Sequence, residues 1–160
     1  MSDINTKEIL AQSALGTELD DQELTTLSER LGLATLAADE DLVREGDERR
    51  TLFILAEGRL NVWKKVGIAE EVVYQMRAGE CAGTRAFIDG SPRKAGLRAE
   101  GPAEVLMLEP EDFEAMIDTH PRIVFKVMRC IFRITHSNLM RMNLESAEMR
   151  NYVLRTGGRY

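Results

Sequence analysis

The most informative segment of the chain runs from Gly79 to Ala95 and reads GECAGTRAFIDGSPRKA. Within it, glycines flank the segment from Thr84 to Ile88, which is long enough for one helical turn, and the first N–H groups of a helix are free to bind an anion. A loop at residues 89–92 leads to Arg93, whose planar guanidinium suits phosphate oxygens. A surface β-turn with a solvated arginine explains the same residues, so both interpretations stay open at this point.

Short apolar runs with turn residues between them surround this stretch and predict an all-β roll or barrel from Leu33 onward. We expect residues 52–55 and 60–63 to be strands of a hairpin, because the turn at 56–59 contains Gly58, which can adopt a positive φ. Further strands are predicted at residues 71–76, 97–99 and 105–108.

Helical patterns lie on both sides of the predicted strands. In residues 1–32 we expect two short helices, the second from Asp21 to Leu31, with Asp20 as its N-cap and Gly32 as its stop. A short helix is predicted from Glu109 to about Asp118. The resulting division of the chain is a helical lead-in at 1–32, a β-roll at 33–120, a helix at 121–152 and a tail at 153–160.

The helix that begins at Pro121 is predicted to be long, because no glycine or proline follows before Gly157. About thirty residues at about 1.5 Å each give roughly 40 Å, so we expect part of the helix to leave the body of the domain. Its apolar residues form two stripes. The first stripe, at the a and d positions of one heptad frame, consists of Phe125, Met128, Phe132, Thr135, Leu139, Met142, Ser146 and Met149. The second consists of Ile123, Val124, Val127, Ile131 and Ile134.

The two stripes predict that one face of the helix docks on the roll and the other on a second copy of the chain. The predicted homodimer interface contains Phe125, Met128, Phe132, Leu139, Met142 and Met149. A single broad stripe that faces the core is the alternative, since Thr135 and Ser146 dilute the seam and methionine packs in many surroundings.

The composition excludes several functional classes. A net charge of −6 argues against direct binding of nucleic acid, which requires a concentrated basic face. Cys81 and Cys130 lie far apart and form no CxxC motif, so we expect free thiols and a cytoplasmic protein. No signal peptide or membrane-spanning run is apparent, so no membrane partner is expected.

The order and spacing of several small residues and one arginine resemble the cyclic-nucleotide-binding domain family over roughly residues 20–135. The matching residues are Gly46-Asp47, Phe53-Ile54-Leu55 with Gly58, Gly79, Gly83, Pro92-Arg93 and Ala95. This family includes the sensor halves of catabolite-activator-type regulators and the regulatory subunits of protein kinase A. The resemblance implies a mainly β fold, an antiparallel jelly roll with N-terminal helices and a long C-terminal helix.

The resemblance also implies a ligand site, with cyclic AMP, cyclic GMP or another cyclic nucleotide as the ligand and no further cofactor. Arg93 would hold the cyclic phosphate, Gly83 would let the backbone approach it, and Phe87 to Ile88 would line the base or ribose side. The implied ligand-binding residues are Gly83, Thr84, Arg85, Ala86, Arg93, Lys94 and Ala95. In catabolite-activator-type regulators a DNA-binding half follows the long helix, but few residues follow Met149, so we expect none here.

Three positions depart from the family pattern. Thr84 stands where the family usually has a glutamate that accepts from the ribose 2′-hydroxyl, and it has no carboxylate. Lys94 replaces a small or hydroxyl residue, and Arg85 adds another cation. If these cations face the pocket, they favour a more anionic ligand, whereas if they face water they are ordinary surface charges. The departures leave two hypotheses, a ligand-binding sensor and a degenerate module that serves as a dimeric interaction scaffold.

Residues that could carry catalysis or bind a metal are few. His120 and His136 are isolated from other ligating side chains, so we predict no metal site. Ser91 lacks the sequence context of a nucleophile, and a cupin-like enzyme would need histidines within the predicted strands. We therefore predict no catalytic residues and no enzymatic activity.

Overall fold

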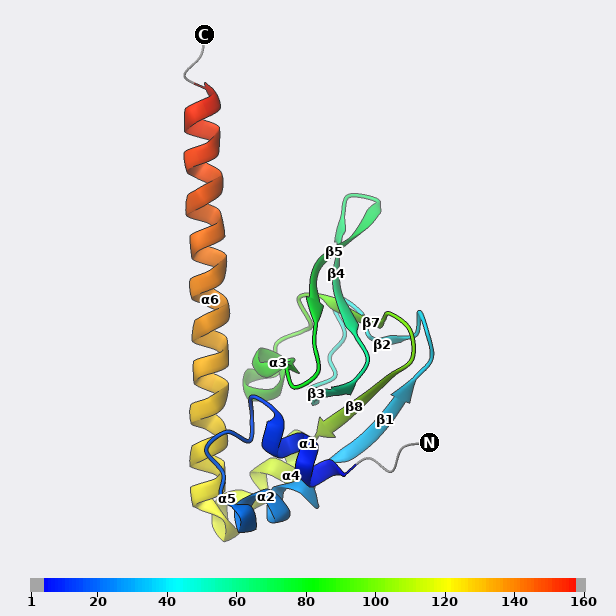
Figure 1. The fold of residues 1–160 in the computed structure, drawn as a ribbon, viewed down its shortest axis with the longest axis vertical. Coiled ribbons are helices and arrows are strands. Elements are labelled where there is room, and N and C mark those ends of the chain that lie inside the picture. Colours follow the sequence, from blue (N-terminus) through cyan, green and yellow to red (C-terminus); the bar gives the residue numbers. More distant parts are fainter. Residues whose placement is uncertain (1–4, 158–160) are drawn as a thin grey trace.

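Two four-stranded antiparallel sheets form the body of the protein, as seen in a computed structural model that describes residues 5–157. Figure 1 shows short helices below the sheets and one long helix, α6 (Pro121–Gly157), along one side of the body. The predicted mainly β architecture with flanking helices and a long C-terminal helix is confirmed. The first four residues of the predicted lead-in and residues 158–160 of the predicted tail lie outside the described part of the chain.

Each sheet combines strands from distant parts of the chain. The first sheet has the order β1 (Gly32–Leu36), β8 (Ala103–Leu108), β3 (Leu52–Glu57), β6 (Cys81–Ala82). The second sheet has the order β2 (Asp41–Val43), β7 (Gly96–Ala99), β4 (Leu60–Val66), β5 (Ala69–Met76).

The predicted hairpin between residues 52–55 and 60–63 is wrong, because β3 and β4 belong to different sheets. Gly58 does adopt the expected positive φ, of +87°. It does so at a corner, where the chain passes from one sheet to the other and a Cβ on Gly58 would lie 2.5 Å from the carbonyl oxygen of Pro102. The hairpin of this region is formed instead by β4 and β5.

Strand β3 is buried on both faces because it lies inside one sheet with packed layers on either side. Phe53 and Leu55 face the space between the two sheets, where they pack with Leu60, Leu97 and Val105. The alternate residues Leu52 and Ile54 face the helices. Their cluster includes Leu10, Leu106, Leu108, Phe113, Met116, Ile123 and Val127.

The N-terminal helices are α1 (Thr6–Gln12) and α2 (Asp21–Ser28). Asp20 is the N-cap of α2, as predicted, and forms a reciprocal capping box with Glu23. The helix ends three residues before the predicted Leu31, and Gly32 is the first residue of β1 rather than a helix stop, because β1 pairs with β8 from its first residue.

The predicted helix at residues 109–118 is divided into α4 (Pro110–Glu114) and α5 (Met116–Thr119). After these, α6 runs to Gly157, five residues beyond the predicted boundary at 152. Glycine is the first helix-breaking residue in that stretch, so nothing local ends the helix earlier. No helix in the described residues is long and apolar enough to cross a membrane.

Most of the apolar residues in the first stripe of α6 are exposed, whereas those of the second stripe face the body, so the single core-facing stripe is wrong. Ile123, Val127 and Ile131 are buried against the body. Between 53% and 69% of the residue surface is exposed at five predicted seam residues, Phe125, Phe132, Leu139, Met142 and Met149. Met128 differs from these five, because its side chain is half-buried against the chain's own core.

Candidate anion-binding site

The centre of the site is the short helix α3 (Thr84–Asp89), which confirms the predicted helical turn. Gly83 precedes it with a φ of +85°, and Gly90 follows it with a φ of +73°. A Cβ on Gly83 would overlap Nη1 of Arg93. Gly83 therefore does two things, since it permits the left-handed backbone and it leaves room for the guanidinium of Arg93.

Arg93 is buried, with 6% of its surface exposed. Its Nε donates to the carbonyl oxygen of Arg49 (2.9 Å), its Nη2 donates to that of Thr51, and its guanidinium lies 5.1 Å from the centre of the Phe53 ring. The backbone is fixed as well, because Arg93 N donates to the carbonyl oxygen of Asp47 (2.9 Å). A surface turn with a solvated arginine is thus the wrong interpretation of this residue.

Among the described residues, the groups in direct contact with the guanidinium of Arg93 are neutral carbonyl groups and an aromatic ring. None of the ion pairs among residues 5–155 involves Arg93. Burial, and secondly the nearby guanidinium of Arg49, lower the pKa of Arg93 to about 10, while Asp47 and Glu109 oppose this shift from further away. Because a buried cation without an ionic partner is costly, an anion beside Arg93 would be stabilised strongly.

The predicted site residues separate into two groups. One group lies around α3 and consists of Gly83, Thr84, Ala86 and Arg93. Ala95 is half-buried and directly precedes β7. Arg85 and Lys94 instead face solvent, and Arg85 pairs with Asp89 at 3.7 Å. This exposure favours the interpretation of these cations as ordinary surface charges.

Thr84 contacts the long helix. The hydroxyl of Thr135 in α6 lies 3.3 Å from the hydroxyl of Thr84. Figure 1 shows α3 lying beside α6 at this level of the molecule. The first residue of the site helix is therefore in direct contact with the helix that carries the exposed seam.

Three residues of the site escaped the sequence prediction, and they are consecutive. Besides the carbonyl groups of Arg49 and Thr51, the site uses the side chain of Arg50, which donates to the carbonyl oxygens of Ala86 (3.4 Å) and Phe87 (3.3 Å). The signal available in the sequence was the pair of adjacent arginines directly before the strongest strand pattern. Nothing in that local pattern indicated that α3 and Arg93 would pack against it.

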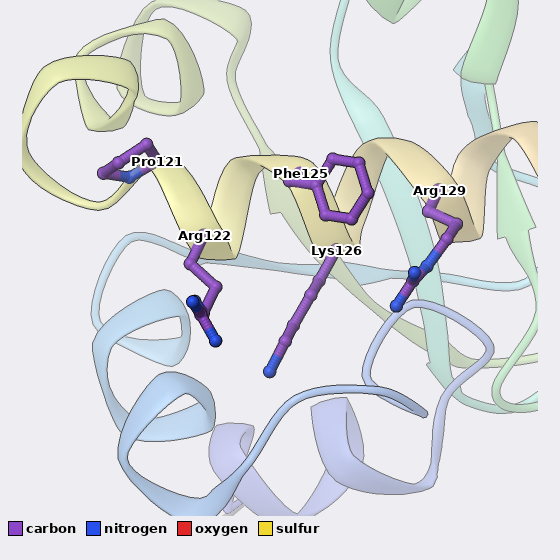
Figure 2. A pocket seen from close by; sticks show the side chains of 5 residues that line it. All are labelled: Pro121, Arg122, Phe125, Lys126 and Arg129. Carbon is purple, nitrogen blue, oxygen red and sulfur yellow. The ribbon is translucent and has the colours of Figure 1, made fainter.

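Two shallow grooves lie elsewhere, and neither is lined by the residues around α3. The larger, about 560 Å³, lies over the start of α6 and is lined by Pro121, Arg122, Phe125, Lys126 and Arg129. Figure 2 shows the three basic side chains extending from α6 to the same side. Lys126 pairs with Glu23 and Arg129 with Glu18, so these two cations join α6 to the N-terminal segment.

The smaller groove, about 310 Å³, lies between α2 and the start of α6 and includes Asp20 and His120. Among residues 5–155, no three His, Cys, Asp or Glu side chains are grouped so that they could hold a metal ion. Arg93 is a buried cation in the part of the chain that the structure describes, and it could hold an anion.

Comparison with known proteins points to one family. A model of the cyclic nucleotide-binding domain matches residues 33–120. The regulatory domain of Toxoplasma gondii PKA, solved with cAMP, is 30% identical, with a TM-score of 0.62 over 69% of this chain and 42% of that one. A cyclic nucleotide-binding domain from Methylobacillus flagellatus KT is 22% identical, with a TM-score of 0.76 over 85% and 77%.

The chain is also similar to a catabolite activator protein and to a much longer mycobacterial protein. The catabolite activator protein of Thermus thermophilus is 23% identical, with a TM-score of 0.71 over 91% of this chain and 72% of that one. An uncharacterized NTE family protein of Mycobacterium tuberculosis is 26% identical over 119 residues, which are 73% of this chain and 20% of that protein. The chain thus spans about a fifth of its mycobacterial relative and less than half of the Toxoplasma domain.

Proposed function

Because the chain belongs to the cyclic nucleotide-binding domain family, we propose that it is a non-enzymatic sensor that binds a cyclic nucleotide or a related anionic ligand between α3 and Arg93. Cyclic AMP and cyclic GMP are the first candidates, and the Toxoplasma relative was solved with cAMP. Regulatory proteins among the similar structures support a regulatory role rather than a catalytic one. The free thiols of Cys81 and Cys130 fit a cytoplasmic location.

The observation that carries the proposal is the burial of Arg93 with no ionic partner among residues 5–155. Its guanidinium is held by two carbonyl groups and one aromatic ring, and its third nitrogen, Nη1, lies against Gly83. An arginine fixed in this way has already lost its side-chain entropy, so little more is lost when an anion binds. Phosphate oxygens next to Nη1 would gain a strong charge-assisted hydrogen bond.

The signal would be passed on through a homodimer formed by the seam of α6. Two observations support this part of the proposal. The seam exposes a long apolar stripe, as interfaces do. Moreover, the contact between Thr84 and Thr135 connects the ligand site to the same helix. The protein that receives the signal would recognise the dimer.

The second candidate function is a dimeric interaction scaffold that binds no ligand. It is supported by Thr84, which has no carboxylate to accept from a ribose hydroxyl. A ribose 2′-hydroxyl beside Thr84 would find a neutral hydroxyl that already contacts Thr135, instead of a carboxylate. An unpaired buried hydroxyl costs about 1 to 3 kcal/mol, which lowers affinity about tenfold to a hundredfold.

The two candidates are separated by titrating the protein calorimetrically with cyclic AMP, cyclic GMP and a cyclic dinucleotide. For a sensor, we expect weak binding of a cyclic mononucleotide by the native chain and stronger binding by Thr84→Glu, because the carboxylate accepts from the ribose. Arg93→Ala should abolish binding, since it removes the buried cation. Lys94→Ala, which removes a neighbouring but exposed cation, is the matched control and should change affinity less than threefold, an effect of about 0.6 kcal/mol.

Opposite effects of Thr84→Glu and Arg93→Ala would support the sensor. Binding that is indifferent to Arg93→Ala would place the site elsewhere. If no ligand binds either the native chain or Thr84→Glu, the scaffold is the better explanation.

A further inference from the structure

The side chain of Arg50 caps the C-terminal end of α3, the end farthest from Gly83. Its Nε and Nη2 donate to the carbonyl oxygens of Ala86 and Phe87. The carbonyl oxygen of Ala86 also accepts from the N–H of Gly90, the residue that follows the helix. Carbonyl groups in the last turn otherwise lack partners within the helix, and a cation is favoured at that end by the helix dipole. Because α3 is only six residues long, it has few hydrogen bonds of its own, so the two from Arg50 matter for its placement.

The residues on either side of Arg50 hold the other half of the site. The carbonyl oxygens of Arg49 and Thr51 accept from the guanidinium of Arg93. Three consecutive residues therefore hold both parts, since the main chain binds Arg93 and the side chain of Arg50 binds α3. The spacing between Arg93 and the start of α3, where the anion would lie, depends on this segment.

We propose that Arg50 is a positioning residue, which fixes α3 relative to Arg93 and so sets the width of the anion-binding site. The consequence for ligand affinity rests on the proposed function. The consequence for the placement of α3 does not, because it concerns hydrogen bonds within the free protein. Arg50 does not need to touch the ligand for this role.

The experiment compares Arg50→Met, Arg50→Lys and the native chain. Methionine keeps an apolar stem but has no donor, whereas lysine restores a charged donor at the helix end. The matched control is Arg59→Met, which removes the same charge from an exposed arginine next to β4. Amide hydrogen exchange of the free proteins is measured by NMR, together with urea unfolding and calorimetric titration with cyclic AMP, also in a Thr84→Glu background.

The amide of Phe87 donates to the carbonyl oxygen of Gly83, and the amide of Gly90 donates to that of Ala86. In Arg50→Met we expect both amides to exchange about tenfold faster, because the end of α3 loses its two hydrogen bonds from Arg50. The urea midpoint and the exchange of β3 amides should match those of Arg59→Met. Arg50→Lys should restore part of the protection. Affinity for cyclic AMP in the Thr84→Glu background should fall about tenfold in Arg50→Met and change little in Arg59→Met.

Unchanged exchange of α3 in Arg50→Met would overturn the proposal, as would a loss of protection spread evenly over the whole protein. If α3 loosens but no variant binds cyclic AMP, the placement of α3 by Arg50 is upheld and the proposed ligand is rejected. If α3 loosens while affinity stays the same, Arg50 does not set the width of the site.

Discussion

Gly83 shows how one missing side chain can define a binding site. The nearest atom to a Cβ at this position belongs to the end of Arg93. In Gly83→Ala we expect the guanidinium to be displaced, because the end of a long side chain moves more readily than the backbone. Binding of cyclic AMP in the Thr84→Glu background should fall at least about tenfold, as one charge-assisted hydrogen bond is lost.

Gly101→Ala is the control for backbone strain in this prediction. Gly101 also has a positive φ, of +80°, but no atom lies within 4 Å of a Cβ built there. Both substitutions should lower the free energy of unfolding by about 1 to 2 kcal/mol through strain, and only Gly83→Ala should weaken binding. Equal affinities in a calorimetric titration of the two variants would contradict the role given to Gly83.

Cys81 offers a prediction that depends on pH. Burial, and secondly the neighbouring Cys130, raise the pKa of the Cys81 thiol to about 12. The folded protein should therefore react very slowly with a thiol reagent at a pH near 8.5, since the thiolate is the reactive form. In guanidinium chloride both cysteines should react at once.

The same shift predicts how Cys81 affects stability. The pKa is raised in the folded state, so between about 9 and 12 the unfolded chain loses its proton first, and the free energy of unfolding falls as the pH rises. Cys81→Ala should remove this part of the pH dependence in urea unfolding experiments. Rapid labelling of the half-buried Cys81 in the folded protein would contradict the raised pKa of its thiol.

The exposed apolar seam of α6 predicts that two copies of the chain form a homodimer along this helix. Glutamate at both Leu139 and Met142 should give monomers, because two charges would be buried in the a and d layers of the seam. Glutamate at Met140 and Leu144 is the control, since these residues are similarly exposed, 55% and 62%, but lie outside the seam. Light scattering at micromolar concentration measures the mass of each variant.

A native chain that is monomeric under these conditions would contradict the predicted dimer. A dimer that survives in the seam variant and dissociates in the control would place the interface on another face of α6.

The sequence predicted some elements well because their signals are local. The two stripes of α6 repeat every few residues, and Gly83 and Arg93 lie within one short motif. The corner at Gly58 has the same local pattern as a hairpin turn, but the sheet to which β3 belongs is decided by its pairing with β8, about fifty residues away. The role of Arg50 was missed for the same reason, since its partners in α3 follow 36 and 37 residues later.

For the whole molecule, we predict that duplex DNA does not bind at physiological salt. The net charge is −6, and Lys126 and Arg129 at the start of α6 are already paired with Glu23 and Glu18. A gel-shift titration with random duplex at micromolar protein should show no complex. A shift that disappears as salt is added would show that a basic face exists after all.

The strand order also has a consequence for how the chain reaches its fold. In the first sheet, β1 pairs with β8, so Gly32 lies opposite Met107. Strand β3 pairs with β6 on one edge and with β8 on the other, so both β1 and β3 need the late strand β8 as a partner. Among the strand pairs of residues 5–157, only the β4–β5 hairpin can form from neighbouring residues. A topology dominated by such distant pairings closes large loops before it gains contacts, so we expect folding on the millisecond-to-second scale. During synthesis, β1 and β3 would leave the ribosome long before their shared partner, and their unpaired edges would be exposed to association with other chains throughout that interval.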